Sequence, residues 1–221
     1  MIDSKLEGLN LILLGSSGVG KGFVMENLPQ AMIDLPSRII EPDQFKITYK
    51  VTDRDPRKSD AQDGVLAVDW SVFDSYKSRF SGIHTPFPNG KRYGWLTHDV
   101  PEAIKGGQIR MADYNVAVLE DILSQPGFER SLVVGLVSSP CYRQENLLIQ
   151  HRGNGWPRQP LPRDPASNID MRVAAGNVYQ ETIQVAFGRG AVDFIIEMGF
   201  NNRESLVPTV RELISRRLNS Y

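Results

Sequence analysis

Cysteine and histidine are scarce in this chain, and their scarcity excludes two kinds of protein. The 221 residues include one cysteine, Cys141, so neither an internal disulfide framework nor a zinc site built from cysteines is expected. The three histidines, His84, His98 and His151, show no metal-ligand spacing. We therefore expect no dedicated transition-metal site, and we interpret Cys141 as a structural residue.

The chain also lacks an excess of charge of either sign and any long apolar run. Its 25 Lys and Arg residues balance 26 Asp and Glu residues, so a strongly basic nucleic-acid-binding protein is not expected, although a local basic patch is compatible with the balance. No apolar run approaches the roughly 20 residues of a membrane span, and the first residues carry no signal-peptide pattern. We therefore expect a cytoplasmic protein that does not contact membranes; its oligomeric state is not indicated.

The residues that are present indicate a globular α/β domain. Hydrophobic residues make up 41% of the chain, and 19 glycines and 14 prolines spread along it exclude a pure coiled coil. Apolar runs alternate with helical segments, which predicts one domain over residues 1–221: a parallel sheet covered by helices on both faces. The expected strands are 9–14, 108–112, 132–138 and 192–197, with a weak edge strand at 47–51. The expected helices are 23–27 (stopped near Pro29), 72–80, 100–106, 116–123, 142–150, 169–187 and 205–218.

Residues 15–22 (GSSGVGKG) form the most informative motif. They match the G-x-x-x-x-G-K spacing of a phosphate-binding loop (P-loop), between an apolar strand and a helix. Backbone N–H groups of such a loop point inward, and the helix N-terminus adds partial positive charge. Lys21 would bridge the β- and γ-phosphates; the alternative, a glycine-rich turn with a solvated lysine, fits the strand–helix setting less well. The predicted ATP-binding residues are Gly15, Ser16, Ser17, Gly18, Val19, Gly20, Lys21 and Gly22.

One position of the loop departs from the usual pattern. Gly22 follows the lysine where a Ser or Thr hydroxyl normally binds magnesium, and Phe23 comes next. Mg²⁺ would then be held by water, the nucleotide phosphates and a carboxylate elsewhere, with Ser16 or Ser17 assisting. The alternative is impaired metal binding and low turnover.

Beyond the loop, several segments resemble the guanylate kinase family in the same order along the chain, over roughly residues 9–215. The resemblance implies a three-layer P-loop kinase fold with an acceptor-binding insert at about 45–100 and a lid at about 150–168. The segments that carry it are TDRDPR at 52–57 (similar to T-x-R-x-P-R), Asp63 with Gly64, a helix with Phe73, Tyr93 with Gly94, Gly106 with Gly107, a strand ending at Asp113, Arg143, Arg152 with Gly153, and Arg172.

The resemblance also implies roles for individual residues. Arg54 and Arg57 would bind the phosphate of a monophosphate acceptor, since guanidinium groups match phosphate oxygens bidentately. Tyr93 would donate a hydroxyl to the same phosphate, and Asp113 would lie near the magnesium or the acceptor. As alternatives, the two arginines pair with neighbouring aspartates of a solvated loop, and Tyr93 packs under a turn.

The lid of the resemblance would bring further arginines to the site. Arg143, Arg152 and Arg172 would close over the transferring phosphoryl group and, with Lys21, offset its charge. Residues 153–165 hold four prolines and two glycines and would form an extended closing loop. The alternatives are a surface for a larger acceptor or a surface excursion without a role.

The positions that read guanine in the family are altered here. His84 stands where the family has a glutamate, and Trp95 replaces a Ser or Thr after Tyr93 and Gly94. Met111 replaces the first aspartate of an Asp-x-Asp pair that ends at Asp113. Trp95 would stack on a base or pack in the core. GMP is therefore not a secure acceptor.

The combined prediction is an enzyme: an ATP- and Mg²⁺-dependent phosphotransferase of guanylate-kinase type acting on a nucleoside monophosphate or a related phosphorylated small molecule. One alternative is a kinase acting on a modified nucleotide, a DNA base or a sugar phosphate; nucleic acid is compatible with the sequence but not favoured. Another is a catalytically weak phospholigand-binding module. No N-K-x-D motif is present, so a GTPase is not expected.

Overall fold

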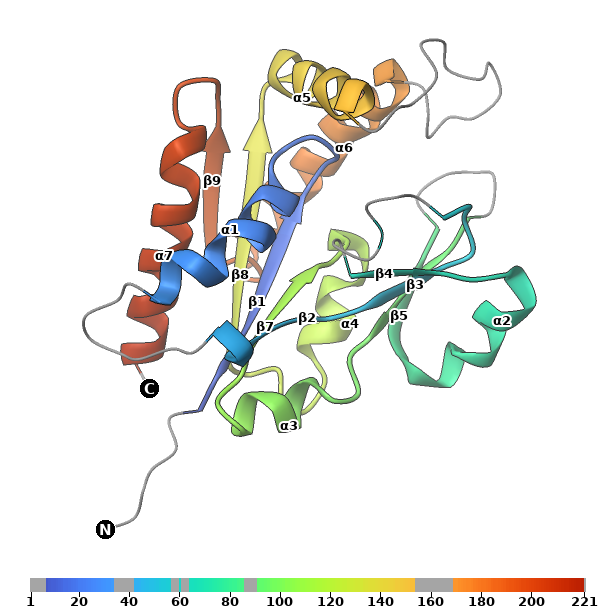
Figure 1. Cartoon of the computed structure of the whole chain (residues 1–221), viewed down its shortest axis with the longest axis vertical. Helices are drawn as coiled ribbons and strands as arrows, with labels where there is room; N and C mark the ends of the chain where they lie inside the picture. Colours follow the sequence, from blue (N-terminus) through green and yellow to red (C-terminus); the bar gives the residue numbers. More distant parts are fainter. Residues whose placement is uncertain are drawn as a thin grey trace.

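Two β-sheets organise the protein, whose structure is a computed structural model that describes residues 7–33, 42–56, 60, 64–85, 91–153 and 169–220. The main sheet is entirely parallel, in the order β2-β7-β1-β8-β9 (Figure 1). Its strands are β1 (Leu9–Gly15), β2 (Phe45–Ile47), β7 (Ile109–Asp113), β8 (Ser131–Ser138) and β9 (Phe194–Met198). The second sheet, in the order β4-β3-β6-β5, consists of β3 (Lys50–Thr52), β4 (Val65–Ala67), β5 (Phe80–His84) and β6 (Tyr93–Leu96).

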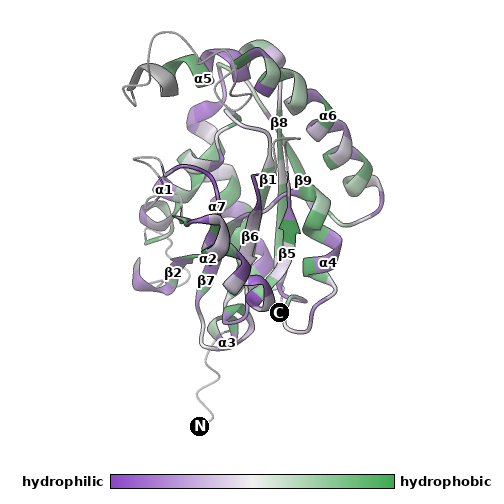
Figure 2. Cartoon of the chain, turned by 90° about the vertical axis from the view of Figure 1, so that its right-hand side faces the viewer, coloured by the Kyte–Doolittle hydropathy of each residue, from purple (hydrophilic) through white to green (hydrophobic). Residues whose placement is uncertain are grey.

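Helices cover both faces of the main sheet. Seen along its edge, the sheet has α1 and α7 on one side and α4 and α6 on the other (Figure 2). The α-helices are α1 (Lys21–Ile33), α2 (Trp70–Ser75), α3 (Val100–Lys105), α4 (Leu119–Leu123), α5 (Pro140–Gly153), α6 (Ile169–Gly188) and α7 (Arg203–Asn219). Short 3-10 turns lie at Pro42–Gln44, Lys77–Arg79 and Val116–Val118. None of the described helices is long and apolar enough to cross a membrane.

The alternating pattern of β1 explains the layers. Leu9, Leu11 and Leu13 point into a core formed with α1 and α7, whereas Ile12 and Leu14 point into a core formed with α3, α4 and α6. A central parallel strand buries both faces, which is why β1 reads as a continuous apolar run. The predicted α/β class with a helix-covered parallel sheet is confirmed.

Helix α1 is longer than the sequence indicated. The prediction that it stops near Pro29 is wrong, because the helix continues to Ile33. Proline removes one backbone hydrogen bond from the helix interior. The second half of α1 nevertheless buries Leu28 and Met32 completely, and this burial of apolar surface offsets the lost bond.

The second sheet is the main feature that the sequence pattern missed. The weak edge strand expected at 47–51 is two strands, β2 in the main sheet and β3 in the second. The helix expected at 72–80 is the shorter α2, followed by a 3-10 turn and β5, and β6 was not expected. The expected helices after residue 99 and the strands β7, β8 and β9 are confirmed to within a few residues.

Candidate functional site

The P-loop lies where β1 ends and α1 begins, at the carboxyl edge of the main sheet (Figure 1). Gly18 and Gly20 have φ angles of +82° and +115°, a region that side chains rarely adopt, so the loop needs glycine at both positions. A Cβ atom on Gly18 would lie 2.9 Å from the Arg143 carbonyl oxygen, and the Asn146 side-chain amide donates to the Gly18 carbonyl over 2.9 Å. Helix α5 thus holds the loop, whose backbone N–H groups at the start of α1 can bind an anion.

Lys21 folds back over its own loop. Its ammonium group donates to the carbonyl oxygens of Gly15 and Ser16, over 3.1 Å in the second case, and lies 3.8 Å from a carboxylate oxygen of Asp113. Burial lowers the pKa of Lys21; Lys50 and Arg172 lower it further, and Asp113 opposes them. Lys21 is therefore the centre of a group of charges that come from different elements.

Asp113 meets this group from the neighbouring strand. It ends β7, whose register pairs it with Leu13 at the end of β1. Its second carboxylate oxygen accepts a 2.9 Å hydrogen bond from Lys50, which begins β3 of the second sheet. Burial would raise the pKa of Asp113, but the two lysines hold it below its ordinary value, so the carboxylate is ionised at neutral pH.

Lys50 is a site residue that the sequence analysis missed. The signal that could have revealed it is strand alternation: Lys50 and Thr52 flank the fully buried Val51 and so share the opposite face. The strand itself was assigned as a weak edge strand, which hid the alternation.

The second sheet turns several predicted acceptor residues toward the main sheet. Register pairs Lys50 with Trp95, Thr52 with Tyr93, and Tyr93 with His84, and directly paired residues share a face. Tyr93 is partly buried and packs against the core cluster that contains Trp95. Burial lowers the pKa of His84, so its imidazole is neutral at neutral pH and offers one donor and one acceptor.

Trp95 belongs to the core. It is 3% exposed, its indole N–H donates to the Asp113 carbonyl oxygen over 2.9 Å, and its ring meets that of Tyr114 edge to face. The prediction that Trp95 stacks on an acceptor base does not fit this position, because no ring face is open. Packing, the alternative drawn from the sequence, fits, and the hydrogen bond fixes the second sheet to the end of β7.

Arg54 is engaged by a carboxylate. Its guanidinium makes a bidentate ion pair with Asp60, one of whose contacts is 3.1 Å, and donates to the Asp55 carbonyl oxygen over 2.7 Å. This geometry matches the alternative in which the arginine pairs with loop aspartates, and an acceptor phosphate would have to displace Asp60. Arg57 lies outside the described residues.

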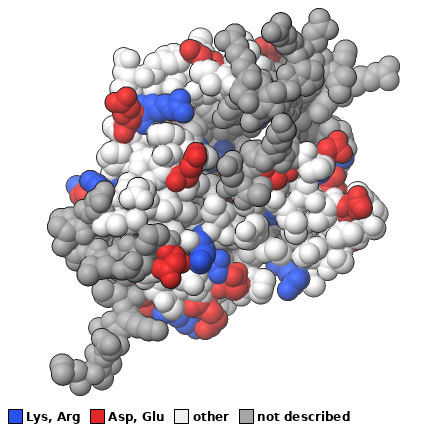
Figure 3. Space-filling view, viewed as in Figure 1, with Lys and Arg blue, Asp and Glu red and all other residues white. Residues whose placement is uncertain are grey.

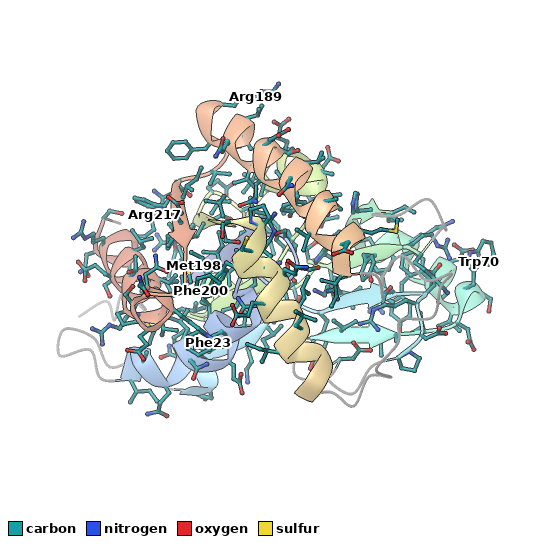
Figure 4. The ribbon with its side chains drawn as sticks, turned by 90° about the horizontal axis from the view of Figure 1, so that it is seen from above. Phe23, Trp70, Arg189, Met198, Phe200 and Arg217 are labelled. Atoms are coloured by element: carbon teal, nitrogen blue, oxygen red, sulfur yellow. The ribbon has the colours of Figure 1, made fainter. Side chains whose placement is uncertain are left out.

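Arg92 anchors the loop that follows β3. It bonds Asp53 over 2.7 Å and Asp74 over 2.8 Å, and its guanidinium lies over the rings of Trp70 and Phe73 at 4.6 Å and 4.3 Å. Trp70 lies at the far end of the second sheet from α7 (Figure 4). Arg92 thereby links α2 to the Arg54 loop.

The predicted lid arginines have different positions. Arg143 is fully buried and donates to Ser138, to Asn177 and, over 3.3 Å, to the Val173 carbonyl. It joins β8 to α6 and cannot close over a ligand, which corrects the expectation for this residue. Arg172 lies on α6, and its positive charge lowers the pKa of Lys21. The side chain of Arg152 and residues 154–168 lie outside the described part.

The side chains that the structure describes around the P-loop do not form a magnesium site. Gly22 has no hydroxyl group, and Phe23 lies under the guanidinium of Arg203 at 5.0 Å, on the side of the molecule that carries Met198 and Phe200 (Figure 4). The Ser16 hydroxyl is buried against Gly176 of α6, whose Cβ atom would lie 3.2 Å from it. Among the described residues, no group of three His, Cys, Asp or Glu side chains could hold a metal ion.

Asp113, the predicted metal ligand, already faces a lysine with each oxygen. A divalent cation bound there would have to displace both ammonium groups, so this assignment does not fit the geometry. On the face shown in Figure 3, the described basic and acidic side chains are interspersed, without a broad field of one sign.

Comparison with solved structures identifies the fold. Guanylate kinase from Anaplasma phagocytophilum matches with a TM-score of 0.62 and 11% identity, covering 97% of this chain and 88% of that chain. Shikimate kinase from Acinetobacter baumannii in complex with shikimate matches with a TM-score of 0.48 and 14% identity, covering 95% and 94%; we infer nothing from this weaker match. No family model and no curated protein matches the sequence. The chain therefore has the P-loop kinase fold.

Proposed function

We propose that this protein is a P-loop phosphotransferase of guanylate-kinase type that transfers the γ-phosphoryl group of ATP to a nucleoside monophosphate or a related phosphorylated small molecule. The observation that carries the proposal is the meeting of Lys21 and Asp113 at the carboxyl edge of adjacent parallel strands, beside a glycine loop that opens a helix. Ligands of open α/β sheets bind at this edge, and the loop suits phosphate oxygens.

The acceptor would bind between this edge and the second sheet, within residues 45–100. Its phosphate would bind Arg54, Arg57 and the Tyr93 hydroxyl. Arg54 would exchange Asp60 for phosphate, because a guanidinium binds both anions with the same pair of N–H groups. His84, paired with Tyr93 in the second sheet, would contact the other end of the acceptor, and its neutral ring is a weaker reader of guanine than a carboxylate.

The side chains would position the two substrates and offset the negative charge of the phosphates, and none of them would form a covalent bond to the transferred group. Lys21 would exchange its bonds to Gly15 and Ser16 for phosphate oxygens. Arg172 and Arg152 would add positive charge as the transferred group develops its negative charge. Residues 150–168 would close as a lid and exclude water, which suppresses hydrolysis of ATP.

A panel of acceptors with γ-labelled ATP tests the proposal. Wild-type protein is expected to label at least one nucleoside monophosphate or sugar phosphate, and Lys21→Met is expected to abolish labelling while preserving the thermal unfolding midpoint. Efficient transfer to GMP would contradict the inference that the altered base-reading positions select a different acceptor. Failure to label any member of the panel, with ATP bound, would contradict the kinase assignment.

A second candidate is a phospholigand-binding module with weak or no catalysis. The observation that favours it is the lack of a magnesium-binding hydroxyl at Gly22, together with the pairing of Asp113 by two lysines. It predicts no measurable ATP affinity and binding of a phosphopeptide that is lost in Arg54→Ala.

A further inference from the structure

Two ammonium groups from different sheets meet on one carboxylate at the P-loop. Lys21 opens α1 and Lys50 opens β3, and they face opposite oxygens of Asp113 at 3.8 Å and 2.9 Å. All three side chains are largely buried, with exposed fractions of 12%, 16% and 26% respectively for Lys21, Lys50 and Asp113. Lys21 is part of the P-loop motif, whereas the motif does not account for the presence of Lys50 beside it.

Among the residues that the structure describes, two lysines face the single carboxylate of Asp113. An excess of positive charge in a partly buried place favours the binding of an anion. Within the same described residues, no group of three His, Cys, Asp or Glu side chains could hold a divalent cation, and Gly22 supplies no hydroxyl group.

We propose that Lys50 is a second phosphate-binding residue, which with Lys21 offsets the negative charge of the ATP phosphates in a site whose described residues form no cluster of metal ligands. The proposal rests on the proposed function, because it requires ATP on the P-loop. Asp113 holds both ammonium groups beside the loop in the free protein. Phosphate oxygens then share the two lysines with Asp113, and ATP binds about as tightly without magnesium as with it.

A purely structural role for Lys50 makes a different prediction. If its ion pair only fixes the second sheet to the main sheet, replacing Lys50 lowers the unfolding midpoint and leaves the ATP affinity of the folded protein unchanged. Lys105 provides the matched control: it is an exposed lysine of α3, paired with Glu102 far from the loop, and its removal changes the net charge equally.

Isothermal titration with ATP tests the proposal, in excess EDTA and in excess Mg²⁺, on the wild type, Lys50→Met, Lys50→Arg and Lys105→Met. In the wild type, the two dissociation constants should agree within about threefold. Lys50→Met should weaken binding in EDTA by about tenfold, as expected for the loss of one charge-assisted contact, with partial recovery in Mg²⁺. Lys50→Arg should retain most of the affinity, and Lys105→Met all of it.

Two results would overturn the proposal while leaving the donor site intact: wild-type binding that is lost in EDTA, or equal affinities for Lys50→Met and Lys105→Met. The first comparison uses only the wild type, so it decides even if Lys50→Met fails to fold. No binding of ATP by the wild type under either condition would overturn the proposed function itself, and this inference with it.

Discussion

Lys21 lies in a largely buried environment of polar and charged groups. Its ammonium group is surrounded by loop carbonyls, by Asp113 and by two further cations, and burial lowers its pKa from the ordinary 10.5. The protonated form is the one that binds phosphate. The free protein therefore loses its capacity to bind ATP at a lower pH than an ordinary lysine would allow.

This shift predicts the alkaline limit of ATP binding. As pH rises, the lowered pKa means that Lys21 deprotonates first, so the ATP affinity of the wild type should decline below pH 10.5. In Lys21→Arg the guanidinium keeps its charge, and the decline should move to higher pH. Titrations with ATP from pH 7 upward measure both curves. Superimposable normalised curves for the two proteins would contradict this account of Lys21.

At the scale of elements, the P-loop packs closely against the helices α5, α6 and α7. Gly18 touches α5, a Cβ atom on Gly20 would lie 3.4 Å from Leu206 of α7, and Gly176 of α6 faces Ser16. The conformation of the loop is therefore set by tertiary contacts as well as by its glycines.

Replacing Gly18 by alanine separates these two causes. Gly190 provides the control, because its φ of +79° is almost the same and nothing lies within 4 Å of its Cβ position. Gly190→Ala should lower the free energy of unfolding by about 1 kcal/mol through backbone strain. Gly18→Ala should cost about 1–3 kcal/mol more through its contacts with Arg143 and Leu147, and should weaken ATP binding. Urea denaturation measures the difference, and equal losses would show that the contacts are unimportant.

How well the elements were predicted follows from how their stability arises. The long buried strands β1 and β8 and the amphipathic helices carry their own pattern of apolar residues, and the P-loop carries its own spacing, so all were predictable. The strands β3, β4 and β6 have three or four residues and depend on pairing with segments far along the chain. Alternation over so few residues is too weak a signal to assign such strands, and the helix expected at 72–80 ends at Ser75.

The site residues also divide into those that a local pattern predicts and those that depend on tertiary contacts. Lys21 and Asp113 were found because motif and strand end are local features. The contact of Lys50 with Asp113 and the buried hydrogen bonds of Arg143 depend on which segments meet in space, so local patterns do not reveal these contacts. The pairing of Arg54 with Asp60 was one of the two alternatives that the sequence left open.

At the scale of the whole molecule, the second sheet contacts the main sheet where β7 ends. Lys50 and Trp95 both bond Asp113, one to its carboxylate and the other to its carbonyl oxygen. These two contacts fix β3 and β6 to the end of β7, next to the P-loop strand β1. Under the proposed function, the acceptor would bind on the second sheet beside the ATP phosphates, because direct phosphoryl transfer needs the two reactants close together.

The most direct test of this arrangement is the mapping of amide chemical-shift changes by nuclear magnetic resonance when ATP is added to the isotope-labelled protein. The account predicts the largest changes in residues 15–22 and at Lys50 and Asp113, with none of them in Lys21→Met at the same ATP concentration. Changes confined to other surfaces, or an unperturbed P-loop at saturating ATP, would contradict the central claim.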